Sequence, residues 1–409
     1  MNATAQNRFG PIFDADHHYW ESSDAFTRYR DPKFKDRGVR VAEHEGQMRY
    51  FVGDRLHPTL PGPGDVHGRP APGILFDYFA GREAIDASKH GYNESPADHP
   101  EWFNRDARLK SMDQQGVEAV WMFPSHGVCM EGPMQPDTEA ALHILSGFNR
   151  WIHDEWGFDY QNRIFGVPFL SLSDVDLAIA ELDWVVQRGA RLISIRNGPA
   201  YTASGNKSPA DPMFDRFWAR VEEAGVVVTV HAGFDDGYGG IDKAVAAVWG
   251  IEHDEYQLSS HVAGGMSFDN QLIWMMMKKR LVHDFAAVII THGLFDRFPR
   301  LKFAFIENGA LWVGPLLHDM HVVHMQNKGM FKTNPVDQFH RNCWVAPFVE
   351  DDVSELAKHI PVERILFGSD WPHAEGLHLP ADYYETLSSF SDAEVRRIMA
   401  ENTRELTLA

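Results

Sequence analysis

The sequence predicts an α/β fold, a (β/α)₈ TIM barrel with large insertions, on the strength of three observations. Short apolar runs rich in β-branched and aromatic residues recur along the chain, a pattern typical of strands buried on both faces of a parallel sheet. Amphipathic helical stretches lie between several of these runs, and strand–helix alternation indicates a parallel sheet. The runs number about eight, and an eight-stranded barrel needs roughly 250 residues, fewer than the 409 of this chain.

The predicted strands and helices can be placed directly on the sequence. The helices are "DVDLAIAELDWVVQRGA" (174–190), which has an apolar stripe and a stop at Gly189, and "DPMFDRFWARVEEAG" (211–225), which begins with Asp-Pro and ends at Gly225. The strands are "PIF" before Asp14, "VEAVWMF" (117–123), "RIFGVPFL" (163–170), "RLISI" (191–195), "VVVTV" (226–230), "LKFAFI" (301–306), a weaker run "NCWVAPF" (342–348) and "RILFG" (364–368).

The surplus length is expected in two insertions, about 22–101 and 232–300, within a single domain that spans residues 1–409. The first contains an alternating, hairpin-like stretch, "VRVAEHEGQMRYFVGDR" (39–55), and a loop rich in Pro and Gly, "HPTLPGPGDVHGRPAPG" (57–73). We expect the segment 22–101 to lie over the barrel mouth as a lid or a subunit contact, where it would help to select the substrate.

Composition narrows the class of partner. The 38 Lys and Arg against 58 Asp and Glu give a net charge of −20, which disfavours nucleic acid and anionic membranes. Two cysteines, Cys129 and Cys343, cannot build a disulfide framework and fit a reducing cytoplasm. The most apolar run, "LIWMMM" (272–277), is too short to span a bilayer. We therefore expect a cytoplasmic protein that acts on a small molecule, with a homodimer as a possible assembly.

Polar side chains follow the predicted strands at the edge where barrel enzymes carry their active sites. A barrel interior would reject such groups unless they had a partner. Two histidines and two carboxylates that converge there form a ligand set suited to a divalent transition metal. The residues at the strand ends are Asp14, Asp16, His18, Arg196, Asn197, His231, Glu307, Asp370 and His373.

The stretch "FDADHHYWES" (13–22) crowds five ionisable residues near the start of the chain. Alternation along an extended strand would turn Asp14, Asp16 and His18 to one side and His17 to the other. Asp14 then either joins the site or braces the turn, and His17 faces packing or solvent. Glu21 either contributes to the site or caps a short helix that begins near Ser22.

Several motifs together resemble the amidohydrolase superfamily, and more narrowly its branch that contains aminocarboxymuconate-semialdehyde decarboxylase and related aromatic-acid decarboxylases. The resemblance implies a (β/α)₈ barrel with one catalytic divalent metal ion, Zn²⁺ or Mn²⁺, held by Asp16, His18, His231 and Asp370. The motifs are D-x-D-x-H at 14–18, "RLKSMDQQGVEAVWMFPS" (108–125), H-x-G-x at 231–234, "FDRFPRLKFAFIENG" (295–309) and "FGSDWPH" (367–373).

The chain departs from this family pattern at two positions. Most related decarboxylases have a histidine or a lone glutamate where the first-strand pair here begins with Asp16, and they place a catalytic histidine where this chain has Glu307. Glu307 and His373 are the predicted acid–base residues, with pairing of Glu307 to Arg196 as the structural alternative. Arg196 is the predicted substrate-binding residue.

Two reactions stay open at this point. The first is the nonoxidative decarboxylation of an aromatic or unsaturated carboxylic acid. The second is the metal-dependent hydrolysis of a C–N, C–O or C–C bond next to a carbonyl group. Both need one acid–base group within hydrogen-bond reach of the reacting atom. A barrel without chemistry is disfavoured, because it would have no need to keep the four ligand positions.

Overall fold

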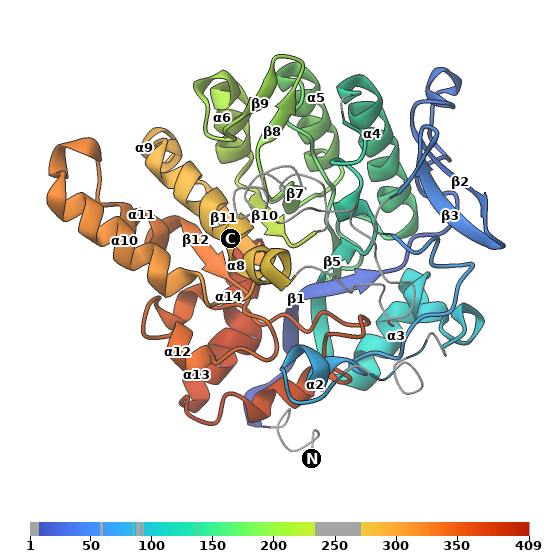
Figure 1. The fold of residues 1–409 in the computed structure, drawn as a ribbon. Helices are drawn as coiled ribbons and strands as arrows, with labels where there is room; N and C mark the ends of the chain where they lie inside the picture. The colour runs from blue at the N-terminus through green and yellow to red at the C-terminus, as the bar shows by residue number, and fades with distance from the viewer. Residues whose placement is uncertain are drawn as a thin grey trace.

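The computed structural model describes residues 8–57, 60–84, 86, 91, 94–135, 137–233 and 271–408, and for 271–279 it describes the backbone alone. Parallel strands form two sheets at the centre of the molecule, in the orders β1-β5-β6 and β12-β11-β10-β7 (Figure 1). These strands are β1 (Ile12–Tyr19), β5 (Val117–Pro124), β6 (Ile164–Gly166), β7 (Leu192–Ile195), β10 (Val227–His231), β11 (Lys302–Ile306) and β12 (Cys343–Val345).

Single bridges close the two sheets into one ring. Phe169, beyond β6, pairs in parallel with Ser194 of β7. On the other side, residues 365–371 pair with β12 through Val345–Ile365 and with β1 through His17–Trp371. The seven strands and this eighth segment therefore form a closed parallel barrel, which confirms the predicted (β/α)₈ fold.

Helices surround the ring of strands (Figure 1). Several begin with a side chain that accepts backbone N–H groups of the first turn, as Asn104, Asp137 and Asp174 do for α3, α4 and α5. The helices are α2 (Phe76–Phe79), α3 (Arg105–Gln115), α4 (Thr138–Glu155), α5 (Val175–Val186), α6 (Asp215–Ala224), α8 (Gln271–Thr291), α9 (Leu294–Arg297), α10 (Val313–Gln326), α11 (Pro335–Asn342), α12 (Val353–Leu356), α13 (Asp392–Arg396) and α14 (Asn402–Leu408).

Both helices predicted in detail are present. α5 lies within the stretch 174–190, and α6 follows a short 3₁₀ turn (Pro212–Phe214) within 211–225. Gly225 ends α6 with a φ of 70°, a left-handed conformation that glycine adopts without the steric cost that a Cβ brings.

The barrel interior is a packed core rather than a channel. Every barrel strand contributes at least one side chain to one buried cluster, so the polar side chains at the strand ends rest on an apolar core. The cluster includes Phe13, Ala15, Trp121, Phe165, Leu192, Val227, Ala304, Ile306, Trp344 and Leu366. A larger apolar cluster contains side chains of the strands and of the surrounding helices.

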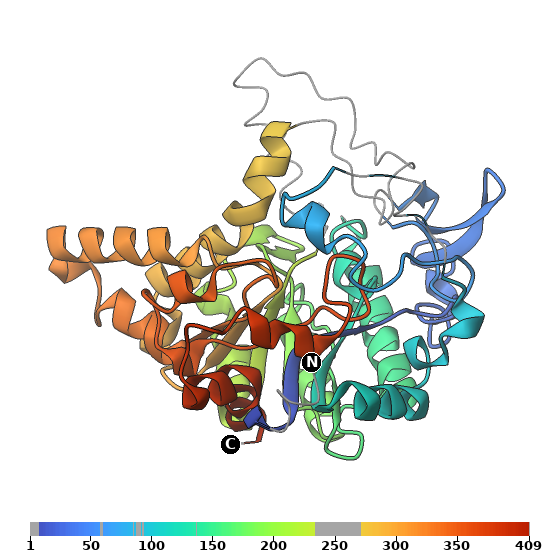
Figure 2. The same cartoon turned by 90° about the horizontal axis from the view of Figure 1, so that it is seen from below.

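The first predicted insertion contains the expected hairpin, built from β2 (Val39–His44), β3 (Gln47–Val52) and β4 (Arg55–Leu56). Its later residues contact the loops that follow the barrel strands (Figure 2). The His57 ring lies 3.2 Å from the Cys129 carbonyl oxygen through Nε2, and the Leu75 N–H donates to Ala374 at 2.7 Å. Two short strands, β8 (Ala200–Thr202) and β9 (Gly205–Lys207), form a second hairpin.

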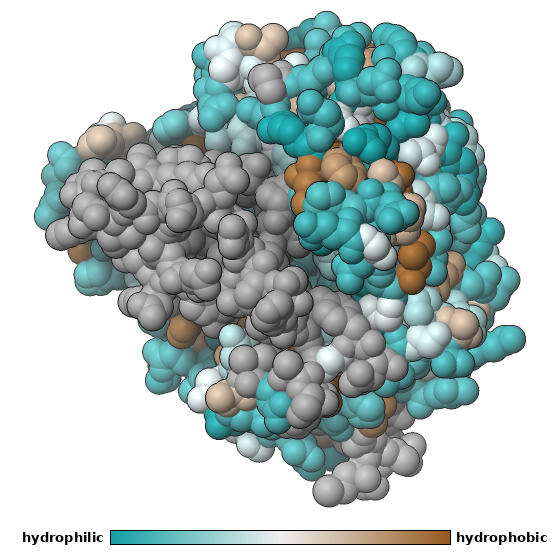
Figure 3. Space-filling model, turned by 45° about the vertical axis from the view of Figure 1, so that its right-hand side comes forward, coloured by the Kyte–Doolittle hydropathy of each residue, from teal (hydrophilic) through white to brown (hydrophobic). Residues whose placement is uncertain are grey.

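The second predicted insertion, 232–300, is described only in part. Residues 234–270 lie outside the described residues. The rest contains α8 and α9, which together connect β10 to β11 as a barrel helix does. In one view the described surface is largely hydrophilic, with small hydrophobic patches (Figure 3). Among the helices of the described residues, none is both long and apolar enough to cross a membrane.

Candidate metal centre

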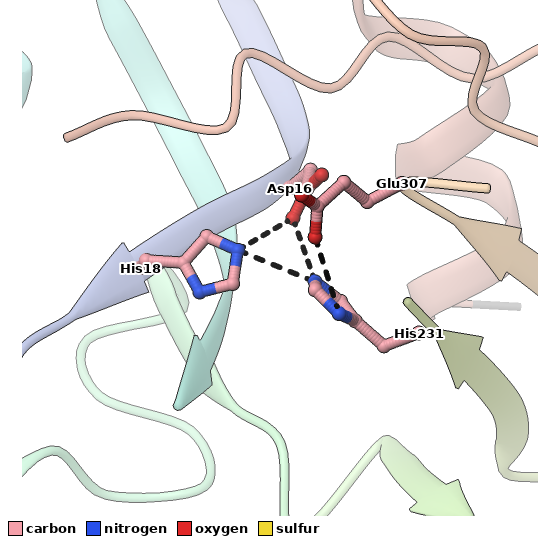
Figure 4. Close-up of side chains that lie close together, drawn as sticks. All are labelled: Asp16, His18, His231 and Glu307. Carbon is pink, nitrogen blue, oxygen red and sulfur yellow. Dashed lines mark hydrogen bonds and ion pairs between the residues drawn. The ribbon is translucent and has the colours of Figure 1, made fainter. Parts of the chain in front are cut away.

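Three of the predicted ligands converge at the carboxyl ends of β1 and β10 (Figure 4). Oδ1 of Asp16 lies 3.1 Å from Nε2 of His18 and 3.3 Å from Nε2 of His231. The two imidazole nitrogens are 3.2 Å apart. Asp370, which follows the eighth segment, brings its Oδ1 to 3.3 Å from Nε2 of His18. All four side chains are buried. Asp16, His18 and His231 form one close group with Glu307, and Asp370 adjoins this group through His18 and Glu307.

Glu307 follows β11 and joins this cluster. Its carboxylate lies 3.5 Å from Nδ1 of His231 and is one-fifth exposed. Glu307 and Asp370 both have left-handed backbones, with φ values of 55° and 57°. Such residues cost of order 1–3 kcal/mol each and concentrate at functional sites. Among the described residues no ion pair joins Glu307 to Arg196, so the structural alternative for Glu307 is not found.

Asp14 does not join the cluster, contrary to the alternation expected along the first strand. Between Asp14 and His17, β1 advances three residues while its partner β5 advances two, from Val120 to Met122. This bulge inserts one residue, and a bulge re-aims the side chains that follow it. Oδ2 of Asp14 therefore lies 3.7 Å from Nε2 of His17, away from the cluster.

The cluster has a definite electrostatic pattern. Burial alone would raise the pKa of Asp16, but its hydrogen bonds with His18 and His231 outweigh burial and hold that pKa well below its usual value. Burial, followed by the nearby His373, lowers the pKa of His18 to about 3. The His18 ring is therefore neutral near pH 7 and can offer a lone pair.

The other two carboxyl groups shift in the opposite direction. Burial raises the pKa of Asp370 well above its usual value, with the charges of Glu375 and Asp16 adding to it. Burial, followed by the charges of Asp370 and Asp16, does the same to the pKa of Glu307. Several carboxylates that face one another in a buried site store repulsion, which a bound cation or a proton relieves.

His373 lies directly beside the ligands. Its ring stacks on that of His18 at a centroid distance of 4.0 Å, and its Nδ1 is 2.6 Å from Oδ1 of Asp370. Its Nε2 is 2.7 Å from the Ser125 hydroxyl oxygen. The hydroxyl proton of Ser125 is donated to the Tyr19 carbonyl at 2.7 Å. Burial lowers the pKa of His373. The ring is thus held in place next to the cluster, as its predicted acid–base role requires.

Arg196 lies apart from these contacts. It is buried after β7, with its guanidinium 3.7 Å from the centroid of the Tyr201 ring. It lines a small hollow together with Glu131 and mostly apolar residues of β7 and of the loops after β6 and β7. Its predicted contact with substrate stays a prediction.

Glu21 does not cap a helix. Its Oε1 accepts hydrogen bonds from the N–H groups of His126 at 2.9 Å and Gly127 at 2.8 Å. Burial raises the pKa of Glu21 to about 7, although these two hydrogen bonds act in the opposite direction. Glu21 therefore fixes the loop after β5, next to the Ser125 that holds His373.

The donor atoms fit a single divalent ion. Metal–ligand distances of about 2.0–2.2 Å place neighbouring ligands roughly 3.0–3.5 Å apart. The donor atoms of Asp16, His18 and His231 are 3.1–3.3 Å from one another, and Oδ1 of Asp370 is 3.3 Å from Nε2 of His18. Nδ1 of His231 lies 2.6 Å from its acceptor, the Ala232 carbonyl, so its proton is there and Nε2 presents a lone pair. Buried Oδ1 of Asp370 is close to Nδ1 of His373 and Nε2 of His18, but no donor among the described residues meets it with hydrogen-bond geometry.

Three residues of this neighbourhood were missed by sequence reasoning. Ser125 holds His373, and Trp20 packs against the His373 ring at 5.0 Å. A carboxylate oxygen of Glu375 lies within 4.8 Å of carboxylate oxygens of Glu307 and Asp370. The segment "SDWPHAEG" contained the signal for Glu375, a further carboxylate two residues after His373. Ser125 and Trp20 carried no comparable signal.

Comparison with known proteins shows the family to which this chain belongs and agrees with its fold. A family model described as amidohydrolase matches residues 13–406. An amidohydrolase from Mycobacterium avium subsp. paratuberculosis K-10 is 37% identical, with a TM-score of 0.88 over 97% of this chain and 99% of that one. A comparison with curated proteins finds no match.

Decarboxylases of aromatic acids share the fold at lower identity. A 2,6-dihydroxybenzoate decarboxylase from Rhizobium is 21% identical, with a TM-score of 0.54 over 74% of this chain and 88% of that one. A dihydroxybenzoic acid decarboxylase from Polaromonas sp. JS666, solved with manganese and 2-nitroresorcinol, is 20% identical, with a TM-score of 0.53 over 83% and 95% of the two chains. From the barrel, the strand-end cluster and the match over residues 13–406, this chain belongs to the amidohydrolase family.

Proposed function

We propose that this enzyme is a divalent-metal-dependent, nonoxidative decarboxylase of an aromatic or unsaturated carboxylic acid. The observation that carries the proposal is the convergence of Asp16, His18, His231 and Asp370 at the barrel mouth, with Glu307 beside them. These four residues would hold the ion, Zn²⁺ or Mn²⁺, which supplies a Lewis acid for the oxygen atoms of a substrate. The aromatic-acid decarboxylases that share the fold support the choice of reaction.

Glu307 is the proposed proton donor. When a carboxylate leaves as CO₂, the carbon that carried it must gain a proton. Burial raises the pKa of Glu307, which favours the protonated form that a proton donor needs, and its carboxyl group lies 3.5 Å from the ligand His231. His373, a ring fixed between Ser125 and Asp370, is placed to orient the substrate. Arg196 is the proposed partner for a second anionic group of the substrate.

The hydrolase is the second candidate, and the carboxylate-rich site supports it. Glu307, Asp370 and Glu375 place carboxylate oxygens within 4.8 Å of one another. Such groups can take the proton from an attacking water as well as deliver one. The position of Glu307, where related decarboxylases have a histidine, is the feature that distinguishes this chain from them.

One experiment separates the two reactions. The purified enzyme, loaded with Mn²⁺ or Zn²⁺, is incubated with a panel of hydroxylated benzoic acids and with amide, ester and β-diketone substrates in H₂¹⁸O. We expect CO₂ release from a hydroxybenzoic acid, with no ¹⁸O in the aromatic product. ¹⁸O uptake into a product carboxylate, without CO₂, would contradict the decarboxylase and establish the hydrolase.

We also propose a cytoplasmic enzyme that works as a homodimer on a small carboxylic acid, without nucleic acid or membrane partners. The net charge of −20 supports the exclusion of polyanionic partners. Cys129 and Cys343 are both buried and neither forms a disulfide bond, which suits a reducing compartment. Size-exclusion chromatography with light scattering tests the assembly, and a dimer should elute at twice the 46.5 kDa chain mass.

A further inference from the structure

Three fully buried side chains form a chain of contacts behind the metal centre: Asp14, His17 and Arg108. We propose that they are a positioning network, which holds three of the four ligands in their binding geometry before the ion arrives. This inference rests on the proposed metal site. None of the three residues belongs to the cluster itself, and Arg108 lies on α3, outside the barrel ring.

Arg108 fixes the protonation of His17. A guanidinium only donates hydrogen bonds, and Nη1 of Arg108 lies 2.8 Å from Nδ1 of His17. Nδ1 is therefore the acceptor, and the ring proton sits on Nε2, which faces Oδ2 of Asp14 at 3.7 Å. The neutral imidazole thus accepts a hydrogen bond from the buried Arg108 guanidinium and lies in contact with the buried carboxyl group of Asp14, beyond hydrogen-bond distance.

Each end of the network forms hydrogen bonds with backbone groups at or next to a metal ligand. Oδ1 of Asp14 accepts the N–H groups of Asp16 and Ser369, both at 3.0 Å. One oxygen atom thereby joins the first and eighth positions of the barrel. Nη2 of Arg108 donates to the backbone carbonyl of His18 at 2.7 Å, and Nε of Arg108 donates to the backbone carbonyl of Glu101 at 2.8 Å.

Trp371 completes the arrangement. Its ring stacks on His17 at a centroid distance of 5.2 Å and lies 4.6 Å from the Arg108 guanidinium. Ser369 and Trp371 are the two neighbours of Asp370, so the network holds Asp370 from both sides. It also touches the backbone of Asp16 and His18, but it makes no contact with His231, which stands on β10.

This geometry predicts a specific effect on metal affinity. The ligand carboxylates and imidazoles lie close together and repel or compete with one another without the ion, so the metal-free site must be held by other contacts. Partners behind the ligands typically contribute 10–100-fold to metal affinity. Loss of the network should therefore weaken Mn²⁺ binding even where the barrel stays folded.

The test compares Asp14→Ala and His17→Leu with Asp14→Asn, which keeps an acceptor oxygen for both N–H groups. Asn342→Ala is the matched control, because Asn342 is an equally buried side chain that bridges backbone, at the opposite end of the barrel. Mn²⁺ dissociation constants are measured by competition with a chelator, and thermal melts of the metal-free proteins report the fold. His17→Phe, which keeps the ring against Trp371 but offers Arg108 no acceptor, replaces His17→Leu should the latter fail to fold.

We expect Asp14→Ala and His17→Leu to raise the Mn²⁺ dissociation constant by ~10–100-fold, Asp14→Asn to stay within a few-fold of wild type, and Asn342→Ala to lower the melting temperature without changing the affinity. Folded Asp14→Ala and His17 variants that bind Mn²⁺ as tightly as wild type would overturn the network. A wild-type enzyme that binds no divalent ion would instead overturn the proposed function on which it rests.

Discussion

The two ends of the barrel differ in whether their buried polar groups have hydrogen-bond partners. At the amino-terminal end, Nδ2 of Asn342 donates to the carbonyls of Pro299 at 3.0 Å and Leu301 at 2.7 Å, and its Oδ1 accepts from Nε of Arg341 at 3.0 Å. At the carboxyl-terminal end, Oδ1 of Asp370 is buried 2.6 Å from Nδ1 of His373 and 3.3 Å from Nε2 of His18, but neither contact has hydrogen-bond geometry.

This difference separates stability from function. A buried polar group with all its partners contributes to folding, whereas one left unsatisfied costs about 1–3 kcal/mol. The Asn342 end stabilises the barrel. The Asp370 end carries a cost that an ion would remove, in agreement with the general location of barrel active sites. The predictions below test this contrast, from the largest effect to the smallest.

The largest effect is expected from Asp16→Asn, which removes the carboxylate shared by His18 and His231. Loss of a direct ligand should exceed the loss caused by a supporting residue, so we expect Mn²⁺ affinity to fall more than ~100-fold and turnover to reach background. Metal analysis after equilibrium dialysis measures the occupancy. Wild-type occupancy in this variant would remove Asp16 from the site.

Glu307→Gln should separate chemistry from metal binding. We expect turnover to fall by ~10²–10⁴, the usual range for a lost general acid or base, with metal content and melting temperature retained. Reduced metal occupancy would instead identify Glu307 as a ligand. A lower melting temperature with unchanged activity per folded molecule would make it structural and leave His373 as the acid–base residue.

Glu21 should make the free energy of unfolding of the protein depend on pH. Its pKa is about 7 in the folded protein against 4.5 for the free side chain, so between these values the folded state keeps a proton that the unfolded state releases. Stability from this group is therefore present below about pH 4.5 and is lost as pH rises through about 7. Relative to Glu21→Gln, the wild type should lose up to about 3 kcal/mol across this window.

Urea unfolding of both proteins at a series of pH values measures this difference. The Gln side chain can still accept from His126 and Gly127 through its oxygen, so the comparison isolates the ionisation of Glu21. Parallel stability curves for the two proteins between pH 4.5 and 7.5 would show that Glu21 does not titrate with a raised pKa.

The smallest effect on catalysis is expected at the opposite end. Asn342→Ala removes two donors to backbone carbonyls, and we expect it to lower the free energy of unfolding by about 1–3 kcal/mol. Turnover and metal content per folded molecule should stay at wild-type values. A parallel loss of metal affinity would contradict the separation of the two ends.

Local sequence patterns predicted most of the barrel because buried parallel strands have a strong apolar signature. The stretch 163–170 shows where such a pattern stops being sufficient. Its strand β6 covers Ile164–Gly166 alone, since Pro168 has no N–H to donate to the ladder, and pairing resumes with the bridge at Phe169. The eighth run, 364–368, pairs only through single bridges, which depend on its neighbours rather than on its own residues.

The ligand positions were predictable because each lies at a strand end, and strand ends meet at one face of a barrel. The environment of Asp14 was not, because the bulge in β1 appears only when its pairing with β5 is known. Arg108 begins one of the motifs noted in the sequence, but the sequence did not indicate its role. Its contacts with His17 and His18 join residues 90 or more positions apart. Long-range contacts of this kind leave no periodic signal in the chain.

The most direct test of the central claim is a crystal structure of the enzyme grown with Mn²⁺, with anomalous data to locate the ion. We predict one strong anomalous peak at the barrel mouth, with Oδ1 of Asp16, Nε2 of His18, Nε2 of His231 and a carboxylate oxygen of Asp370 at about 2.0–2.3 Å. An ion bound elsewhere, or any two of these four side chains turned away from it, would contradict the account.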